Sequence, residues 1–365
     1  MNKVKLGDMI TFQRGYDLTH NQMKGGNIPV VGSSEIIGWH NEVKVKAPVL
    51  LIGRSGTVGR PQFYKTDIWA HNTTLFVSDF HNNDPEFCFY FLKNLNLEDY
   101  ANFSGVPTLN RNFIHPLIVN FPDLPTQTAI ADVLSSLDDK IALNNKINKE
   151  LEDLAKTIYD YWFVQNADEK WERKKIGEIA ETGSGGTPLT SNRSFYDFGN
   201  IPWINSSELN NSYIIDTKNY ITEAGLKNSS AKIFPANSLL IALYGATAGK
   251  VSLLSIPAST NQAICAIIPF SDIYIYYLKF YLSDLYKFLV QVSSGSARDN
   301  LSQELIRNLE VPIPSSSILI RYYEIINPLI FDIINNLKQN LLLMHLRDWL
   351  LPMLMNGQVS VENRL

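Results

Sequence analysis

The sequence lacks the patterns by which most enzymes are recognised. Its 365 residues include only two cysteines, Cys88 and Cys265, which indicates small buried side chains and neither a disulfide nor a metal pair. The six histidines show no metal-ligand spacing, and His71 is interpreted as a structural loop residue and not as a general base. Gly249-Lys250 is followed by valine, so the phosphate-binding loop of nucleotide hydrolases is missing. These absences favour a binding protein over an enzyme.

Long apolar runs and a strong charge of one sign are missing too. No apolar stretch reaches the length of a membrane span, so we expect no membrane partner. The opening residues 1–6 lack the apolar region of a secretory signal peptide, which favours a cytoplasmic protein. The net charge is −4, and residues 126–169 alone carry −5 (4 basic, 9 acidic residues), whereas residues 1–125 are neutral (11 and 11). The neutral parts permit a local basic face.

What the sequence does contain is one series of segments that occurs twice. The first copy holds Leu6-Gly7-Asp8, Ile28-Pro29-Val30, Leu50-Leu51-Ile52 and Gly56–Arg60, and the second holds Ile176-Gly177-Glu178, Ile201-Pro202-Trp203, Leu239-Leu240-Ile241 and Gly245–Lys250. Gly56 precedes Asn72 by 16 residues and Gly245 precedes Asn261 by 16, which aligns the two asparagines. A period of about 170–190 residues is a whole domain and not a solenoid unit. Two such modules suit a protein that binds two similar partners.

Each copy is followed by a stretch with the apolar spacing of a coiled coil. Residues 126–164 place Ile130, Leu137, Asn144, Leu151 and Ile158 on one seam position, with Val133, Lys140, Ile147, Leu154 and Tyr161 on the other. Residues 316–351 repeat this with Leu319, Ile326, Ile333, Asn340 and Arg347, partnered by Ile330, Leu337, Met344 and Leu351. An ordinary amphipathic helix on a core is the alternative. If the two helices pair antiparallel, they form a rod that holds two domains at a set distance.

The expected fold class is α+β, with two similar globular α/β domains separated by two long antiparallel coiled-coil helices in a pseudo-twofold internal repeat. Short β-branched runs predict strands at 49–52, 74–77, 238–241 and 263–268, and one helix per copy is expected at 85–95 and 274–290. The layout is a first domain at 1–125, a first helix at 126–168, a second domain at 169–314, a second helix at 315–352 and a tail at 353–365.

The loops between the expected strands are rich in groups that can contact a nucleic acid. Glycines let a backbone approach a phosphate, and arginine can read guanine with two hydrogen bonds. The candidates are Arg14, Arg54, Ser55, Thr57, Arg60, Asn72 and Arg111 in the first copy, and Thr187, Arg193, Tyr244, Lys250, Asn261, Gln262 and Arg298 in the second. A basic residue follows Gly59 and Gly249 alike, which favours Arg60 and Lys250. A structural turn with a solvated side chain is the competing interpretation for each residue.

Aromatic and large apolar residues close both helical stretches. Tyr161, Trp162 and Phe163 end the first stretch, and Trp349 and Leu350 end the second. Such side chains are frequent anchors of protein interfaces. The second stretch is also apolar beyond a single seam, which indicates that another protein covers it. Alternatively, both clusters pack on their own globular domains.

In the order of these segments the chain resembles the specificity (S) subunit of a type I restriction–modification system. The resemblance covers nearly the whole chain and is carried by the opening tripeptides Leu6-Gly7-Asp8 and Ile176-Gly177-Glu178, the two glycine loops, Gly185-Gly186-Thr187-Pro188 with Ile201–Ile204, the segment Pro122–Gln127, and the tails Tyr161–Val164 and Leu350–Gly357. The chain departs from the pattern at Gly15-Tyr16-Asp17-Leu18, where the second copy has Gly-Gly-Thr-Pro, and at Ser315-Ser316-Ser317, which stands where the first copy has Thr126-Gln127.

This resemblance implies that each globular copy is a target recognition domain for one half of a split double-stranded DNA site. The helices would be spacers that fix the number of unread base pairs. Such a subunit has no catalysis and no cofactor of its own. It docks two methyltransferase (M) subunits, which bind S-adenosylmethionine, and through them two restriction/translocase (R) subunits, with ATP and Mg²⁺ also expected in the partners. The competing hypothesis from the residues alone is a non-enzymatic coiled-coil scaffold with two protein- or glycan-binding domains.

Overall fold

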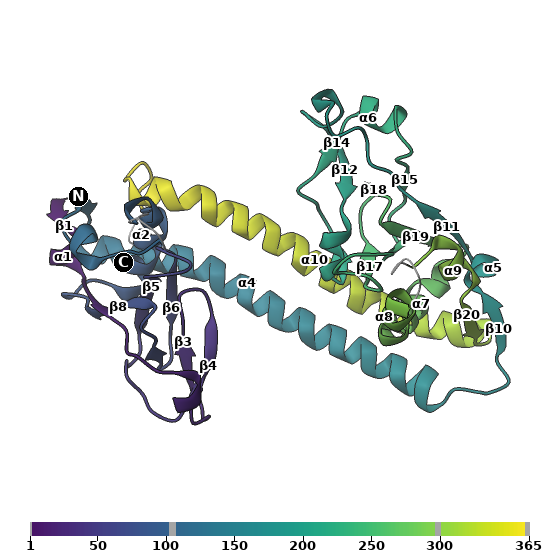
Figure 1. Cartoon of the computed structure of the whole chain (residues 1–365), viewed down its shortest axis with the longest axis horizontal. Coiled ribbons are helices and arrows are strands. Elements are labelled where there is room, and N and C mark those ends of the chain that lie inside the picture. The colour runs from purple at the N-terminus through teal and green to yellow at the C-terminus, as the bar shows by residue number, and fades with distance from the viewer. Residues whose placement is uncertain (1, 102–106, 296–300, 362–365) are drawn as a thin grey trace. The chain divides into compact units, whose positions relative to one another are not determined.

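The computed structural model describes residues 2–101, 107–295 and 301–361, which divide into two compact units (Figure 1). Unit 1 comprises Met1–Ala142 together with Leu341–Leu365, and unit 2 comprises Leu143–Asn340. The two long helices, α4 (Leu124–Tyr159) and α10 (Ser316–Met355), both cross this division. Each unit therefore contains one globular part and a portion of each helix, and the helices do not form a separate third body.

Unit 1 is built mainly from short strands. Its elements, besides its shares of α4 and α10, are β1 (Asn2–Lys5), α1 (Leu6–Met9), β2 (Thr11–Arg14), η1 (His20–Gln22), β3 (Ile28–Val31), β4 (Ile36–His40), β5 (Val49–Gly53), β6 (Pro61–Tyr64), β7 (Trp69–Ala70), β8 (Thr74–Asp79), α2 (Pro85–Asn94), η2 (Leu97–Tyr100), α3 (Arg111–Ile114) and β9 (Ile118–Phe121). The strands form three sheets, with the orders β2-β8-β5-β6, β4-β3-β7 and β1-β9.

With additional short strands and helices, unit 2 follows a similar order of elements. They are η3 (Asp160–Gln165, a π-helical continuation of α4), β10 (Glu172–Lys175), α5 (Ile176–Ile179), β11 (Ala180–Ser184), η4 (Arg193–Phe195), β12 (Ile201–Ile204), η5 (Ser206–Asn210), β13 (Tyr213–Ile214), β14 (Tyr220–Ile221), α6 (Glu223–Lys227), β15 (Ile233–Phe234), β16 (Leu239–Ala242), β17 (Val251–Leu254), β18 (Ala258–Thr260), β19 (Ile264–Pro269), η6 (Asp272–Tyr274), α7 (Ile275–Asp284), α8 (Tyr286–Gly295), α9 (Gln303–Asn308) and β20 (Glu310–Ile313). Its sheets are β11-β19-β16-β17-β13, β14-β12-β18-β15 and β10-β20.

The repeated segments of the sequence occupy matching places in the two units. The first strand of each globular part pairs with its last strand, as β1 with β9 and β10 with β20, both antiparallel. Parallel pairing also recurs, with β3 beside β7 in unit 1 and β12 beside β18 in unit 2. The strands expected at 49–52, 74–77, 238–241 and 263–268 are confirmed as β5, β8, β16 and β19. The helix expected at 274–290 is instead two helices, α7 and α8, which are separated at Leu285.

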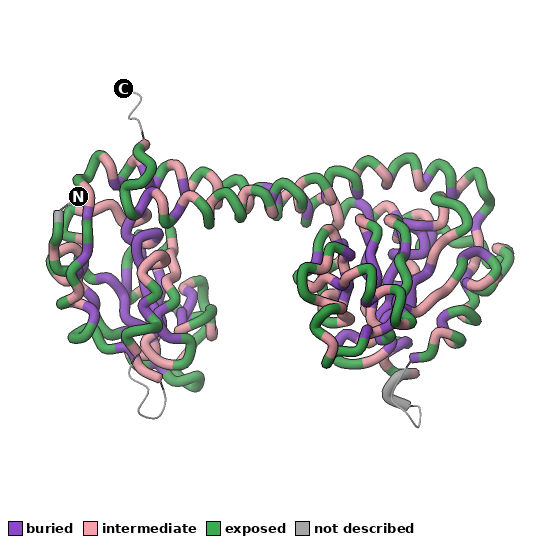
Figure 2. The backbone as a smooth tube through the Cα atoms, turned by 90° about the horizontal axis from the view of Figure 1, so that it is seen from above, coloured by how far each residue is buried: buried purple, intermediate pink, exposed green. Residues whose placement is uncertain are grey.

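Each unit has its own apolar core, and the long helices contribute to both cores. In unit 1, Ile130 and Leu134 of α4 and Leu351 of α10 pack with the sheet residues and with α2. In unit 2, Tyr159 of α4 and Tyr322 of α10 are buried with the sheet residues and with α7. Figure 2 shows the buried positions gathered inside each globular part, with exposed positions along the outer faces of the long helices. The larger sheet of each unit therefore buries one face against helix, as an α+β unit requires.

Hydrogen bonds between α4 and α10 show how the two helices pair within unit 2. Asn144 Nδ2 donates to Asn340 Oδ1 (2.8 Å), and Asn336 Nδ2 donates to Asn148 Oδ1 (2.9 Å). Residue numbers rise along α4 as they fall along α10, so the helices are antiparallel at these contacts.

One of the two expected seam positions on α4 is wrong. Lys140, Leu154 and Tyr161 are exposed, whereas Asn148 and Ala155 are buried. The second seam therefore lies four residues after the first and not three, because spacings of three and four alternate along any coiled-coil stripe. Every helix within residues 2–101, 107–295 and 301–361 is too short or too polar to span a bilayer.

Candidate nucleic-acid interface

A glycine-rich loop follows the central buried strand of each unit. In unit 1 it follows β5, where Gly59 has φ of 77° and a Cβ there would lie 2.5 Å from the backbone nitrogen of Glu98. Only glycine fits this left-handed and crowded position. The N–H of Gly59 donates to the carbonyl of Gly53 (2.9 Å), and that of Gly249 donates in the same way to Ala242 (2.9 Å). The two loops thus close alike, and the loop in unit 2 is one residue longer.

A second close approach of two segments lies beside this loop. A Cβ on Gly15 would lie 2.1 Å from the carbonyl oxygen of His71, and one on Gly185 would lie 2.0 Å from that of Thr260. Glycine therefore lets the chain cross the end of the parallel strand pair in both units. Directly after this crossing, Asp17 accepts a hydrogen bond from the side chain of Asn72.

The matching pair in unit 2 is Thr187 and Gln262, where the threonine hydroxyl donates to the glutamine side-chain oxygen. The alignment of Asn72 with Asn261 is therefore wrong by one residue. The backbone N–H of His71 donates to Val31, and that of Asn261 donates to Ile204 in the matching strand (both 3.0 Å). His71 thus corresponds to Asn261, and Asn72 to Gln262. The equal spacing of 16 residues hid the extra residue in the second glycine loop.

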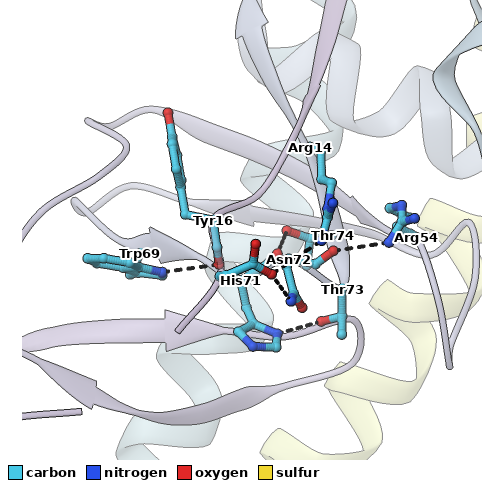
Figure 3. Close-up of polar contacts among 9 residues, drawn as sticks. Arg14, Tyr16, Arg54, Trp69, His71, Asn72, Thr73 and Thr74 are labelled. Atoms are coloured by element: carbon cyan, nitrogen blue, oxygen red, sulfur yellow. Dashed lines mark hydrogen bonds and ion pairs between the residues drawn. The ribbon is translucent and has the colours of Figure 1, made fainter. Parts of the chain in front are cut away.

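Three of the expected arginines of unit 1 surround one hollow. Arg14 ends β2, Arg54 follows β5 and Arg111 begins α3, and all three line an open hollow of about 780 Å³. Asp17 and Asn110 line it as well. Figure 3 shows Arg14 and Arg54 beside the crossing at Asn72. We call the hollow lined by Arg14, Arg54 and Arg111 the arginine hollow.

Each arginine is held by a single hydrogen bond among the described residues. Arg14 Nη2 lies 3.2 Å from Asp17 Oδ1, Arg54 Nη1 donates to the carbonyl of Asn72 (3.4 Å), and Arg111 Nη1 donates to the carbonyl of Phe12 (3.2 Å). A guanidinium has several further N–H donors, so most of these remain available to a ligand. The arrangement suits an anion or a base edge with acceptor atoms.

Arg60 lies apart from this group. It lines a different hollow, of about 450 Å³, with Lys65 and the acidic residues Glu86, Asp138 and Asp139. Three carboxylates against two cations disfavour a phosphate there. Ser55 and Thr57 stay on the glycine loop, where Ser55 forms a bridge to Thr108 at the edge of the arginine hollow and Thr57 is exposed.

The expected contacts of unit 2 are more dispersed. Thr187 and Gln262 lie together, as described above. Lys250 Nζ donates to Asn210 Oδ1 and lines a small hollow of about 250 Å³ with Gly249 and Tyr286. Arg193 lies on η4 and is exposed.

Two further unit 2 candidates have structural surroundings. Asn261 Oδ1 accepts from the backbone N–H of Ala263 (3.1 Å), which makes it a turn-forming residue. Tyr244 is half-buried and packs against the unit 2 core. Arg298 lies outside the described residues.

Sequence reasoning missed residues that the structure places beside the candidates. Asn110 and Asn112 line the arginine hollow, and Asn110 caps α3 by accepting from the backbone N–H of Asn112 (3.0 Å). Phe198 has φ of 59° and a fully exposed ring (103%) on the loop after η4. Its sequence signal was weak, because a lone aromatic before a glycine predicts no particular backbone conformation.

The expected partner-binding residues divide between core and surface. Phe163 is buried with Tyr277 and Tyr322, at ring centroid distances of 4.7 Å, so it cannot serve as a surface anchor. Trp162 and Leu350 are half-buried against the cores of units 2 and 1 respectively. Tyr161 and Trp349 are exposed at 58% and 56%.

His71 has a structural environment, as expected. Its Nδ1 lies 3.0 Å from Thr73 Oγ1, and burial lowers the pKa of its imidazole (Figure 3). Among the residues described by the structure, no group of three or more His, Cys, Asp or Glu side chains could hold a metal ion.

Comparison with known proteins places this pair of units in one family. The family model described as type I restriction modification DNA specificity domain matches residues 1–153 and 168–343. The specificity subunit of the type I restriction enzyme HindI from Haemophilus influenzae is 26% identical over 357 residues, which covers 75% of this chain and 77% of that protein. The EcoR124I/EcoR124II specificity subunit from Escherichia coli is 26% identical over 330 residues, with 85% and 80% covered.

A solved structure agrees at the level of the fold. The crystal structure of the type I restriction–modification S subunit from M. genitalium aligns with a TM-score of 0.71 at 17% identity, and covers 97% of this chain and 95% of that one. The family match spans most of the chain and includes both globular parts. The chain therefore belongs to the type I restriction–modification DNA specificity family, as a specificity subunit, the non-catalytic kind of subunit in such systems.

Proposed function

We propose that this chain recognises a bipartite double-stranded DNA target, with one half read by each unit. The observation that carries the proposal is that both units share a similar sheet order, a glycine loop that closes in the same way, and a hydrogen-bonded side-chain pair at matching positions after the crossing glycine. In this proposal a pseudo-twofold axis would relate the two reading surfaces, so that they would meet the two halves in opposite strand orientation. The family membership supports DNA as the ligand.

In this proposal α4 and α10 are the spacer between the two half-sites. Both helices are continuous between the units, with 36 and 40 residues, and they contribute to both cores. Insertion of seven residues into each helix, after Ala142 and after Asn340, adds about 10 Å of helix, which corresponds to about three base pairs. We expect the unread spacer of the target to lengthen accordingly. An unchanged spacer would overturn the ruler role.

The partners in this proposal are two methyltransferase (M) subunits and, through them, two restriction/translocase (R) subunits. S-adenosylmethionine, ATP and Mg²⁺ would bind on those partners, and this chain would carry no cofactor. Tyr161 and Trp349 support a protein interface because both are large, amphipathic and more than half exposed at the ends of the long helices. Each M subunit would flip an adenine of its half-site out of the duplex in order to methylate it.

The deciding experiment is a single-molecule methylome of cells that express this chain together with its M subunit. We expect an N6-methyladenine motif in two short halves with a fixed gap, which disappears when this gene is deleted. A matched control expresses the M subunit alone. A stable complex with M that yields no motif and shows no salt-dependent DNA binding would overturn the proposal and favour the scaffold hypothesis.

A further inference from the structure

The two units share one hydrogen bond from a helix side chain to a strand carbonyl, which we call the brace, but they form it with different residues. In unit 1, Arg111 donates to the carbonyl of Phe12 (3.2 Å). In unit 2, Gln303 donates to the carbonyl of Thr182 (2.9 Å), which holds the matching strand position. Both residues directly follow a helix-capping residue. Arg111 and Gln303 therefore occupy equivalent places.

The remaining members of the arginine hollow can be matched in the same way. The backbone N–H of Leu109 donates to the carbonyl of Arg54, and that of Leu301 donates to the carbonyl of Leu243 (2.8 and 2.9 Å). Strand register places Ser184 opposite Cys265, as Arg14 is placed opposite Leu75. The three arginines of unit 1 thus correspond to Ser184, Leu243 and Gln303 in unit 2.

This exchange removes every positive charge from the matched positions. Gln303 is also fully engaged, since its amide donates to Thr182 and its Oε1 accepts from the Ser184 hydroxyl (3.1 Å). The hollow of about 640 Å³ that Gln303 lines contains Lys175 and Arg307 against Glu178 and Glu304, so its formal charges cancel. The arginine hollow of unit 1 instead contains three arginines against the single carboxylate of Asp17.

We infer that the arginine hollow of unit 1 binds a phosphate of the DNA backbone, and that the described residues of unit 2 form no such site at the equivalent place. Three guanidinium groups that converge on one hollow match a phosphate oxygen cluster, whereas a guanine edge needs only one arginine. The inference rests on the proposed function and deepens it. The two half-sites are then held differently, with unit 1 contributing most of the salt-dependent binding.

The test exchanges residues between the units in the full-length chain bound to its M subunits. Arg14→Ser, Arg54→Leu and Arg111→Gln each introduce the residue that unit 2 already tolerates, so the brace and the fold are retained. The probe is a duplex that carries the motif found in the methylome, or a random duplex if no motif is found. Affinity is measured by fluorescence anisotropy across a range of KCl concentrations.

We expect these variants to lower the slope of log affinity against log salt by up to about 0.9 for each phosphate that the protein no longer neutralises. Gln303→Arg in unit 2 should steepen it. Lys65→Gln removes one charge from unit 1 outside the arginine hollow and should leave the slope unchanged, which controls for net charge.

The outcomes separate this inference from the proposed function. Unchanged slopes in all three variants, with salt-dependent binding intact in the parent protein, would overturn the phosphate site alone. An altered base preference at one position with an unchanged slope would also overturn it and indicate base reading. Absence of salt-dependent binding in the parent protein would instead overturn the proposed function. Thermal unfolding of each variant identifies loss of fold, and Arg14→Ser, which removes only an exposed ion pair, keeps the test decisive.

Discussion

Lys279 and Glu152 form an ion pair in unit 2, with Nζ 3.3 Å from Oε1, and the lysine side chain is only 4% exposed. The pair joins α7 of the globular part to α4. The ammonium also lies over the rings of Tyr213 (4.7 Å) and Phe280 (4.6 Å), which partly replace its missing hydration. Burial lowers the pKa of Lys279, and the charge of Glu152 opposes that effect. Helix α4 is therefore attached to the globular part of unit 2 by a buried charge.

Removal of the carboxylate should cost more than removal of the lysine. Glu152→Ala leaves a buried ammonium without its counter-charge, and we expect the free energy of unfolding to fall by about 2 kcal/mol, below the usual range for fully buried pairs because Glu152 is 36% exposed. Lys279→Met keeps the apolar contacts and should cost less than about 1 kcal/mol. Urea unfolding of both variants measures the difference. Equal losses would mean that packing, and not charge, holds α7 on α4.

The structure also separates Arg60 from the other expected DNA contacts of its loop. Its hollow contains Glu86, Asp138 and Asp139, which repel phosphate. We expect Arg60→Ala to weaken DNA binding less than about twofold at about 0.1 M salt, and Arg54→Ala to weaken it by about fivefold or more. Anisotropy titrations on one duplex compare the two. If Arg60→Ala weakens DNA binding more than Arg54→Ala does, Arg60 belongs to the DNA interface.

Sequence reasoning was sufficient for the local features of the site and insufficient for its assembly. The turn at Gly59 was predictable, because glycine and a short loop between apolar runs specify it locally. The meeting of Arg14, Arg54 and Arg111 was not, because they come from three distant segments and only the sheet register brings them together. The same limit applies to the alignment of Asn72, which depended on a one-residue difference in loop length.

The helices illustrate a second limit, which is the choice between a spacing of three and a spacing of four residues from the first seam to the second. Apolar spacing predicted both long helices and their first seam, with Asn144 and Asn340 buried at its centre as expected. The second seam was misplaced because it holds Asn148 and Ala155, whose side chains carry little apolar signal. Tertiary packing, and not residue type, decides which stripe is buried.

The buried asparagines should make the helix pair specific at some cost in stability. Asn340→Leu removes the 2.8 Å acceptor of Asn144 Nδ2 and leaves this group with only the side chain of Gln339 (2.7 Å), so we expect the free energy of unfolding to fall by about 1 kcal/mol. The double variant Asn144→Leu/Asn340→Leu removes both groups and should recover most of that stability. A double-mutant cycle by urea unfolding measures the coupling. Additive effects would show that the asparagines do not act as a pair.

Phe198 should destabilise the loop that carries it. Its φ of 59° is unfavourable for a residue with a bulky side chain, and its fully exposed ring buries no surface in compensation. Phe198→Asn should raise the free energy of unfolding by about 1 kcal/mol, because asparagine tolerates this conformation. Leu189→Asn is the matched control, since Leu189 is 64% exposed on the segment before η4 and has no positive φ. A decrease in stability of Phe198→Asn in thermal unfolding would contradict the strain.

The tyrosines in the unit 2 core should make the protein sensitive to alkaline pH. Burial raises the pKa of Tyr159, Tyr277 and Tyr322 above the ordinary value for a phenol. In the unfolded chain these groups ionise at about pH 10. Between that pH and their higher folded pKa values the folded state binds more protons, so stability is complete below about pH 10 and falls as the pH rises further.

Tyr322→Phe tests whether tyrosine ionisation causes this loss of stability at alkaline pH. The hydroxyl of Tyr322 is buried without a hydrogen-bond partner among the described residues. We expect the variant to be more stable by about 1 kcal/mol at about pH 8 and to lose stability less steeply above about pH 10. Tyr161→Phe, at a position 58% exposed, should change neither property. Urea unfolding at several pH values provides both quantities. If Tyr322→Phe loses stability as steeply as the parent protein, ionisation of this tyrosine does not drive alkaline unfolding.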